Sequence, residues 1–285
     1  MTLSSHEEGT TMTDGVGAEC HGLHWTENAY CEHATLFYEV DVSIYEDSEL
    51  TSHEVDMAFK AIEAVGHTPR GTILDLACGT GRHAYEFAYR GMQVVGLDMS
   101  AAWLSIAARR TDSQRSNPHP RISLIEGDMR SLPFSTRAFR QISLLGNGFG
   151  YFSDAENAMI LKEIARILDR RGVFVFDLTD CERYIRSFAP YSQREVETRT
   201  FGNVICAYWR EWQPERRRMS VRERYTDARG QVLYDAPYDV RQYTLGELRE
   251  LLANVGFRSV EIQPMNQTKK REGLMRNRIM VVATR

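Results

Sequence analysis

Between residues 72 and 179, short apolar runs alternate with amphipathic segments, and this alternation sharply limits the folds open to the chain. The apolar runs are "TILDLA", "QVVGLD", "ISLIEGD", "FRQISLLG" and "VFVFDL". The segments between them include "GRHAYEFAYRG", "SAAWLSIAARR" and "DAENAMILKEIARILDRRG", the last with Asp154 as its predicted N-cap and Gly172 as its stop. Strands that are apolar along their whole length belong to parallel sheets covered by helices on both faces. We therefore predict a doubly wound α/β fold.

The alternation stops after Asp177. Residues 180–243 hold one short helical stretch, "CERYIRSF", and otherwise extended segments with turn residues such as Asp227 and Gly230. They predict an antiparallel β insertion after the fifth strand, which we expect to cap the acceptor site. A helix with a capping box, Thr244 and Glu247, then precedes two closing strands. We assign the α/β core to residues 67–179 and 244–285.

The N-terminal 66 residues divide into two parts. Residues 1–24 are rich in Gly, Ser and Thr and lack periodicity, so we expect a disordered leader. In residues 25–66 the apolar positions Val55, Phe59 and Ile62 fall near helical spacing, and Gly66 is a stop signal. We predict that residues 25–66 form a helical lid.

Composition excludes several classes of protein. The 285 residues carry a formal charge of −4 and no apolar run of 18 residues, so we expect neither nucleic acid binding nor a membrane span. The one basic run, "PERRRMSVRERY", is interpreted as a solvated strand edge. An odd, scattered set of five cysteines indicates a reducing, cytoplasmic location. One Cys/His cluster matches no common zinc spacing, and we predict no metal; its members are Cys20, His21, His24, Cys31 and His33.

Three aspartates follow three successive predicted strands. Asp75 ends the first strand, ahead of a turn that contains Gly79 and Gly81, and Asp98 ends the second. Asp128 follows the third. Ligands of parallel sheets bind at the carboxyl ends of strands, where glycines let the backbone approach closely and a carboxylate can accept from ribose hydroxyls. The pattern predicts a cofactor that contains adenosine.

Two adenosine cofactors fit this turn. "GTGRHA" matches the fingerprint of NAD enzymes, which keeps an NAD-dependent oxidoreductase as the alternative. Asp75 lies four residues before Gly79, where its charge would oppose a pyrophosphate. S-adenosylmethionine has no phosphate, and its amino-acid end carries an ammonium and a sulfonium. Charge therefore favours S-adenosylmethionine.

The motifs also resemble a known family. "ILDLACGTGRHAYEFAYRGMQVVGLDMS", "IEGDMRSLPF" and "FRQISLLGNGFGYF" are similar to those of class I S-adenosylmethionine-dependent methyltransferases, in particular the bacterial small-molecule and natural-product tailoring branch. The resemblance implies a Rossmann-like sheet of seven strands with the last one antiparallel. It also implies the following cofactor contacts: Asp75, Ala77, Gly79 and Gly81 at the methionine end; Asp98 and Met99 at the ribose; Asp128 and Met129 at the adenine; Leu145 and Gly146 beside the sulfonium; and Tyr38 or Tyr45 closing over the cofactor.

The acceptor is less constrained by the sequence. "GNGFGYF" replaces the Asn/Asp-Pro-Pro-aromatic motif of enzymes that methylate DNA bases or glutamine, and its Asn147 either orients an acceptor or caps the turn. Aromatic residues are abundant in the lid and the insertion, and we name Phe149, Tyr191 and Tyr208 as substrate contacts alongside Asn147. Tyr151 and His24 are the candidate catalytic residues.

These aromatic residues favour a small aromatic or prenylated metabolite, methylated at C, N or O by in-line transfer. An alkene carbon is a possible nucleophile, since it needs no base and would leave a cation for the aromatic faces. A non-catalytic S-adenosylmethionine-binding regulator is a second alternative. The lid is also a candidate for homo-oligomer contacts.

Overall fold

A computed structural model describes residues 24–42, 46–113, 121–188, 194–265 and 277–285. The predicted leader, residues 1–24, lies outside this part of the chain except for His24, as do the candidate site residues Tyr45 and Tyr191. No helix among the described residues combines the length and the apolarity needed to cross a membrane.

The core is a sheet that we call sheet A. Its strands within the described residues are β1 (Thr72–Leu76), β2 (Gln93–Asp98), β3 (Ile122–Glu126), β4 (Phe139–Leu144), β5 (Leu168–Thr179), β10 (Ser259–Pro264) and β11 (Arg278–Thr284). They lie in the order β10-β11-β5-β4-β1-β2-β3, and β11 is antiparallel to both neighbours while the other pairs are parallel. This confirms the predicted doubly wound, mostly parallel sheet. Because β2 and β4 flank β1, the loops that follow all three strands meet at one edge.

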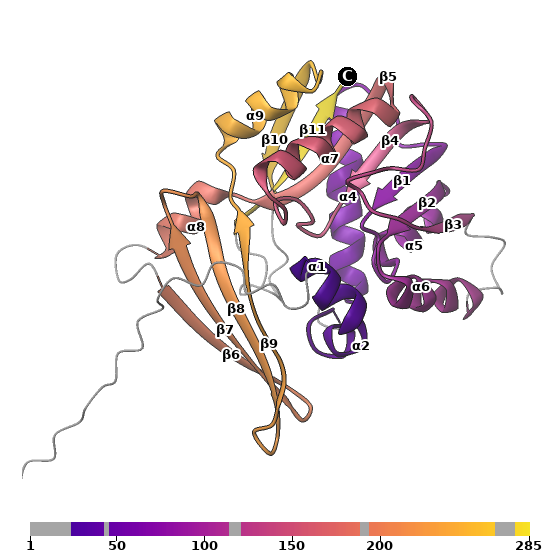
Figure 1. Ribbon diagram of the computed structural model, residues 1–285. Coiled ribbons are helices and arrows are strands. Elements are labelled where there is room, and N and C mark those ends of the chain that lie inside the picture. The colour runs from indigo at the N-terminus through magenta and orange to yellow at the C-terminus, as the bar shows by residue number, and fades with distance from the viewer. Residues whose placement is uncertain (1–23, 43–45, 114–120, 189–193, 266–276) are drawn as a thin grey trace, which may run out of the picture.

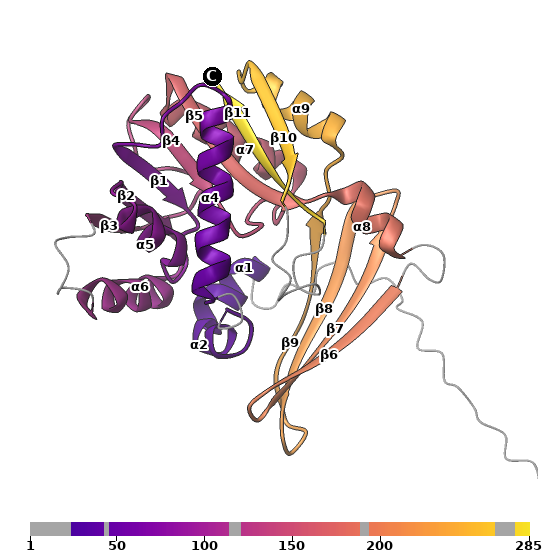
Figure 2. The same ribbon diagram turned by 180° about the vertical axis from the view of Figure 1, so that it is seen from behind.

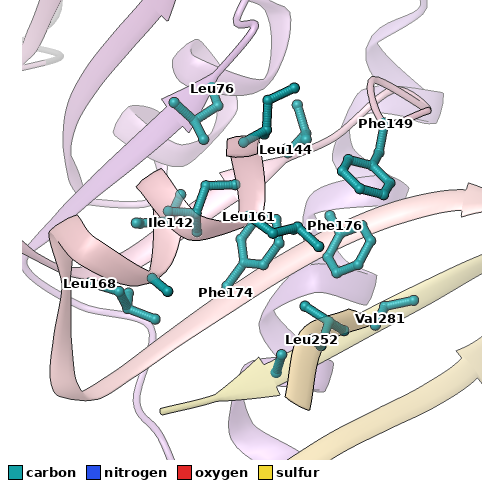
Figure 3. Packing of buried hydrophobic residues seen from close by; sticks show 14 of the residues in the cluster. Leu76, Ile142, Leu144, Phe149, Leu161, Leu168, Phe174, Phe176, Leu252 and Val281 are labelled. Carbon is teal, nitrogen blue, oxygen red and sulfur yellow. The ribbon is translucent and has the colours of Figure 1, made fainter. Parts of the chain in front are cut away.

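Helices cover both faces of sheet A. They are α4 (Ser48–Ala64), α5 (Arg82–Tyr89), α6 (Ala101–Ser113), α7 (Asp154–Ile167) and α9 (Leu245–Asn254). Alternate strand residues point to opposite faces, so Phe174 and Phe176 pack with Leu161 of α7 and Leu252 of α9, whereas Val173 and Val175 pack with α4 and α5. Figure 3 shows the first of these two cores.

The predicted ends of α7 need correction. Ser153, not Asp154, is the N-cap, and it forms a capping box with Glu156. The helix ends at Ile167 rather than at Gly172, because Leu168 already pairs with β4. A Cβ on Gly172 would lie 2.6 Å from the Leu168 side chain, so this glycine serves a close approach within β5. By contrast, the predicted capping box of α9 is confirmed.

A second, antiparallel sheet follows β5, as predicted. Its strands, together called sheet B, are β6 (Arg194–Phe201), β7 (Val204–Gln213), β8 (Arg218–Asp227) and β9 (Val232–Arg241), after the short helix α8 (Cys181–Phe188). The basic run forms part of β8, a central strand, so its interpretation as a strand edge is wrong. Its arginines are instead paired with acidic neighbours: Arg218 with Asp239, and Arg222 with Asp235.

The first helical turns lie between the two sheets. They are α1 (Trp25–Glu27), η1 (Asn28–Glu32), α2 (Ala34–Phe37) and η2 (Tyr38–Val42), which we call the N-terminal segment. Figures 1 and 2 show α1 and α2 between sheet B and the core. Phe37 packs with Tyr208, Tyr225 and Tyr234 of sheet B. Helix α4, in contrast, packs on sheet A. The predicted lid therefore meets the edge where the strand loops lie through residues 25–42 and through Glu46, which accepts a hydrogen bond from the hydroxyl of Thr80 at 2.5 Å.

Candidate functional site

The turn after β1, which we call the glycine turn, runs from Ala77 to Gly81. Its backbone is left-handed at Ala77 (φ +48°), Gly79 (φ +56°) and Gly81 (φ +80°). A left-handed alanine is unfavourable, and such strain is typical of functional sites. The turn leads directly into α5, for which Gly81 is the N-cap.

Glycine is required at position 81 for two reasons: the backbone is left-handed, and there is no room for a side chain. A Cβ there would lie 3.0 Å from the Cβ of Ala107. We expect Gly81→Ala to lower the free energy of unfolding by about 2 kcal/mol, through backbone strain and overpacking. Gly71→Ala is the matched control, because Gly71 has φ +81° but no atom near its Cβ position. Equal losses in the two variants, measured by urea unfolding, would contradict the steric part of this explanation.

Asp75 is 1% exposed at the end of β1, with β2 on one side and β4 on the other. Its Oδ1 accepts a hydrogen bond from Ser143 Oγ at 2.9 Å, whereas its Oδ2 is buried without a hydrogen-bond partner. Burial raises the pKa of this carboxyl, and His83 opposes the rise. The backbone N–H of Ala84 and the hydroxyl of Ser143 also stabilise the charged carboxylate, and Oδ2 can accept a further hydrogen bond from a ligand. An ammonium group fits this oxygen and a pyrophosphate does not.

Asp98 joins the end of β2 to the glycine turn. Its Oδ2 accepts from the backbone N–H of Gly79 at 2.7 Å, and its Oδ1 accepts from that of Ser100 at 2.8 Å. Burial raises the pKa of Asp98 to about 6, although these hydrogen bonds oppose the rise. A carboxylate has about four lone-pair sites, so two remain for hydroxyl donors such as those of a ribose.

The N-terminal segment contacts this edge directly. The thiol of Cys31 lies 3.6 Å from the carbonyl of Met99, and the indole Nε1 of Trp103 donates to the carbonyl of Ala34 at 3.0 Å. Burial and then the charge of Asp98 raise the pKa of Cys31. The sequence places Cys31 in the Cys/His cluster but does not show that it lies beside the end of β2. Among the described residues, no group of three or more His, Cys, Asp or Glu side chains could hold a metal ion.

Asp128 is held by a neighbour that the sequence did not single out. The two oxygens of Asp128 accept from the backbone N–H and the Nε of Arg130, at 2.7 and 2.8 Å. Arg130 also pairs with Glu27 and Glu156, and its guanidinium lies 4.7 Å from the ring centre of Phe152. Arg130 thus links the loop after β3 to α1 and α7. Met129 is partly buried against the core beside it.

The loop after β4 begins with Leu145, Gly146 and Asn147, which we call the β4 turn. Leu145 is buried, and the next two residues are left-handed, with φ of +97° and +63°. The side-chain oxygen of Asn147 accepts from the backbone N–H of Thr179 at 2.9 Å. Of the two roles left open for Asn147, its Oδ1 therefore performs the structural one.

The two candidate catalytic residues lie where α1 meets this loop. The carbonyl of Tyr151 accepts from Trp25 Nε1 at 3.2 Å, and the two rings meet edge to face at 5.1 Å. His24 stacks on Phe152 at 4.7 Å, and its Nδ1 lies 2.8 Å from the hydroxyl of Thr26. Burial and then the charge of Arg130 lower the pKa of His24, which keeps a neutral imidazole at neutral pH.

The predicted aromatic contacts lie in different places. Phe149 is 3% exposed and packs on Phe176 and Tyr243 in the core, so the expectation that it faces an acceptor is wrong for this arrangement. The sequence does not show which way the loop folds, so it does not distinguish a buried loop phenylalanine from one that lines a pocket. Tyr208 is buried on the face of sheet B that meets the N-terminal segment, and Tyr38 is partly buried at the start of η2.

Comparison with known proteins identifies a methyltransferase domain in this chain. Residues 73–172 match a family model described as a methyltransferase domain. The chain is 25% identical to a putative methyltransferase of Bacillus subtilis over 78% of its own length and 87% of that protein. It is 32% identical to a demethylmenaquinone methyltransferase of Renibacterium salmoninarum, but spans only 44% of that protein.

Solved structures agree on the fold. An S-adenosylmethionine-dependent methyltransferase from Clostridium acetobutylicum aligns over 90% of this chain and 99% of its own, with a TM-score of 0.62 and 18% identity. An amino pentose methyltransferase from Micromonospora echinaspora, solved with S-adenosylmethionine, aligns over 81% and 89%, with a TM-score of 0.55 and 23% identity. The match to the domain model covers the glycine turn, the ends of β2 and β3 and the β4 turn. Residues 73–172 are thus a methyltransferase domain, and the chain has the fold of class I S-adenosylmethionine-dependent methyltransferases.

Proposed function

We propose that this methyltransferase acts on a small-molecule acceptor that binds where the N-terminal segment, sheet B and the loop after β4 meet. The observation that carries the proposal is the position of Trp25. Its ring stacks on Tyr238 of sheet B at 4.3 Å and meets Tyr151, in the loop after β4, at 5.1 Å. One side chain of the N-terminal segment therefore touches both the insertion and the strand edge that carries the cofactor residues.

We assign the cofactor contacts as follows. The unpartnered oxygen of Asp75 accepts from the ammonium of the methionine end, and Asp98 accepts from the ribose hydroxyls. Met129 covers the adenine, next to Asp128. The bound S-adenosylmethionine supplies an electrophilic methyl group. The chain's own task is to align the acceptor with that group and to exclude water, which does not need a strong base.

Two acceptor classes fit this region. The stacked rings of Trp25 and Tyr238 favour a flat aromatic or prenylated metabolite, including one with a carbon nucleophile whose cation the rings would stabilise.

An amine acceptor is the second candidate, favoured by Glu223. This carboxylate is 3% exposed on β8 and accepts from the hydroxyls of Tyr225 and Tyr238, the latter at 3.2 Å. A buried carboxylate beside aromatic rings suits an ammonium, either a protonated amine or its methylated product. The amino pentose acceptor of the structural neighbour from Micromonospora belongs to this class.

Calorimetry and a labelled-methyl assay test the function together. We expect S-adenosylhomocysteine to bind at micromolar concentrations and NADH not to bind; the reverse would support the oxidoreductase. Methyl transfer is then assayed with one panel of amino sugars and another of phenols and prenylated aromatics. Binding without transfer to any member would favour the regulator.

Glu223→Gln separates the two acceptor classes, with Glu197→Gln, on the neighbouring part of sheet B, as the control. For an amine acceptor we expect KM to rise about tenfold or more in Glu223→Gln, because a charge-assisted contact is lost. For a neutral aromatic acceptor we expect KM to change by less than about threefold, since no charge is involved.

We also propose a cytoplasmic location and a homo-oligomer that forms through the N-terminal segment. The exposed, unpaired thiol of Cys31 supports a reducing compartment. Sedimentation of the chain with and without residues 1–45 tests the oligomer.

A further inference from the structure

Five charged or titratable side chains meet behind the β4 turn; we call them the Glu54 network. Glu54 of α4 accepts from Arg82 and His83 of α5, the latter at 2.8 Å, and from Arg278 of β11 at 2.6 Å. Arg278 also donates through Nε to Asp177 of β5 at 2.6 Å. The network thus joins residues 54, 82–83, 177 and 278 of the chain.

The network is buried. Glu54 is 1% exposed and Asp177 is 0% exposed. Although burial opposes the ionisation of Glu54, the charges of Arg278 and Arg82 hold its pKa well below the usual value. Apolar side chains of similar size often stabilise a fold as well as buried ions do. The network is therefore better explained by what it positions than by stability alone.

The β4 turn is what the network holds. Asp177 accepts from the backbone N–H of Gly146 at 2.7 Å and from that of Asn147 at 3.1 Å. Both residues are left-handed, a conformation that glycine and asparagine adopt more readily than other residues, and the two hydrogen bonds to Asp177 fix it. A Cβ on Gly146 would also lie 3.6 Å from Arg82 Nη2 and 3.9 Å from His83 Cε1. The turn is thus contacted from β5 and from the start of α5.

We propose that Asp177 and Arg278 are positioning residues for the methyl donor. Asp177 holds the β4 turn in one arrangement beside the methionine end of S-adenosylmethionine, and Arg278 holds Asp177 against Glu54. This inference rests on the proposed function and on the placement of the sulfonium next to Leu145 and Gly146 that the resemblance to methyltransferases implies. It predicts that the network affects binding of the positive sulfonium more than binding of the neutral thioether of S-adenosylhomocysteine.

Asp177→Asn tests the proposal, with both ligands titrated by calorimetry and the melting temperature measured in parallel. The substitution leaves an amide group facing backbone donors and leaves Arg278 with one carboxylate fewer. We expect the affinity for S-adenosylmethionine to fall about tenfold or more, and that for S-adenosylhomocysteine by about threefold at most. Arg278→Lys keeps the charge but loses the planar fork of the guanidinium. We therefore expect this variant also to lose more affinity for S-adenosylmethionine than for S-adenosylhomocysteine, with a difference about a third of that in Asp177→Asn.

Arg166→Met is the matched control. Arg166 pairs with Glu163 and donates to the carbonyls of Leu132 and Phe134, so its loss costs stability away from the β4 turn. A purely structural network predicts that all three variants lower the melting temperature and leave the ratio of the two affinities unchanged, and this result would overturn the proposal. If Asp177→Asn does not fold, the ratio in Arg278→Lys decides. A wild-type chain that binds neither ligand would contradict the proposed function itself.

Discussion

Asp98→Ala lowers the affinity for S-adenosylhomocysteine by about 100-fold or more, because two hydrogen bonds from ribose hydroxyls to a charged, buried acceptor are lost. The variant also leaves the N–H groups of Gly79 and Ser100 without their acceptor, which loosens the glycine turn. Isothermal calorimetry measures the change. Asp235→Ala is the control, since Asp235 pairs with Arg222 and Arg224 on sheet B. An affinity for Asp98→Ala within threefold of wild type would rule out the ribose assignment.

The pKa of Asp98 adds a pH dependence to this prediction. Ribose hydroxyls donate to the ionised carboxylate, and the pKa of Asp98 in the free protein is about 6. We therefore expect affinity to rise with pH up to about 6 and to level off above it. Asp75 also has a raised pKa, so the profile must be compared with that of Asp98→Asn, which should lack the Asp98 component. If the wild type and Asp98→Asn show the same dependence of affinity on pH, a group other than Asp98 is responsible for it.

The raised pKa of Asp98 has the opposite effect on stability: it makes the folded protein less stable as the pH rises. Because the folded pKa of about 6 exceeds that of an unfolded aspartate, the folded state without cofactor binds more protons between about pH 4 and 6. The contribution of Asp98 to the free energy of unfolding therefore falls as pH rises through this window and is constant above it. Thermal unfolding of the wild type and Asp98→Asn at pH 5 and pH 7 measures the difference.

Deletion of residues 1–45 abolishes methyl transfer and leaves sheet A folded. Of the described residues 24–42, none belongs to the two cores of sheet A, whereas sheet B loses the cover that Ala29, Phe37 and Val40 provide. The deletion also removes Trp25 and Cys31, which contact the loops after β4 and β2. Circular dichroism and the labelled-methyl assay provide the two readouts.

Deletion of residues 1–23 is the control, because it leaves every described residue in place, and we expect it to keep activity. Phe37→Ala measures the effect of the N-terminal segment on stability while the rest of the segment stays in place. The substitution removes a large ring from the contact with Tyr225 and Tyr234, and we expect the free energy of unfolding to fall by about 3 kcal/mol. Full activity after removal of residues 1–45 would refute a role for the N-terminal segment in catalysis.

Most of the fold was predictable because its signals are local. Apolar runs, glycine stops and the capping box of Thr244 depend on neighbours within a few residues, so they can be read from the chain. The ends of α7 could not be predicted in this way. Its start is ambiguous because Ser153 and Asp154 are both good caps, and its end depends on the pairing of Leu168 with β4, a contact between distant segments. The same limit explains Phe149, whose burial depends on Phe176 and Tyr243.

The candidate cofactor residues follow from the sequence for a related reason. Asp75 and Asp98 end adjacent parallel strands, and a parallel sheet brings such ends together whatever the loops do. The Glu54 network could not be predicted, because its partners come from α4, α5, β5 and β11 and meet only in the folded protein. Trp25 meets Tyr238 across 213 positions of sequence in the same way. The local sequence pattern thus determines which residues lie at the ends of the strands. The arrangement of the proposed acceptor region depends on packing between segments that are distant in the sequence, and a local pattern does not predict such packing.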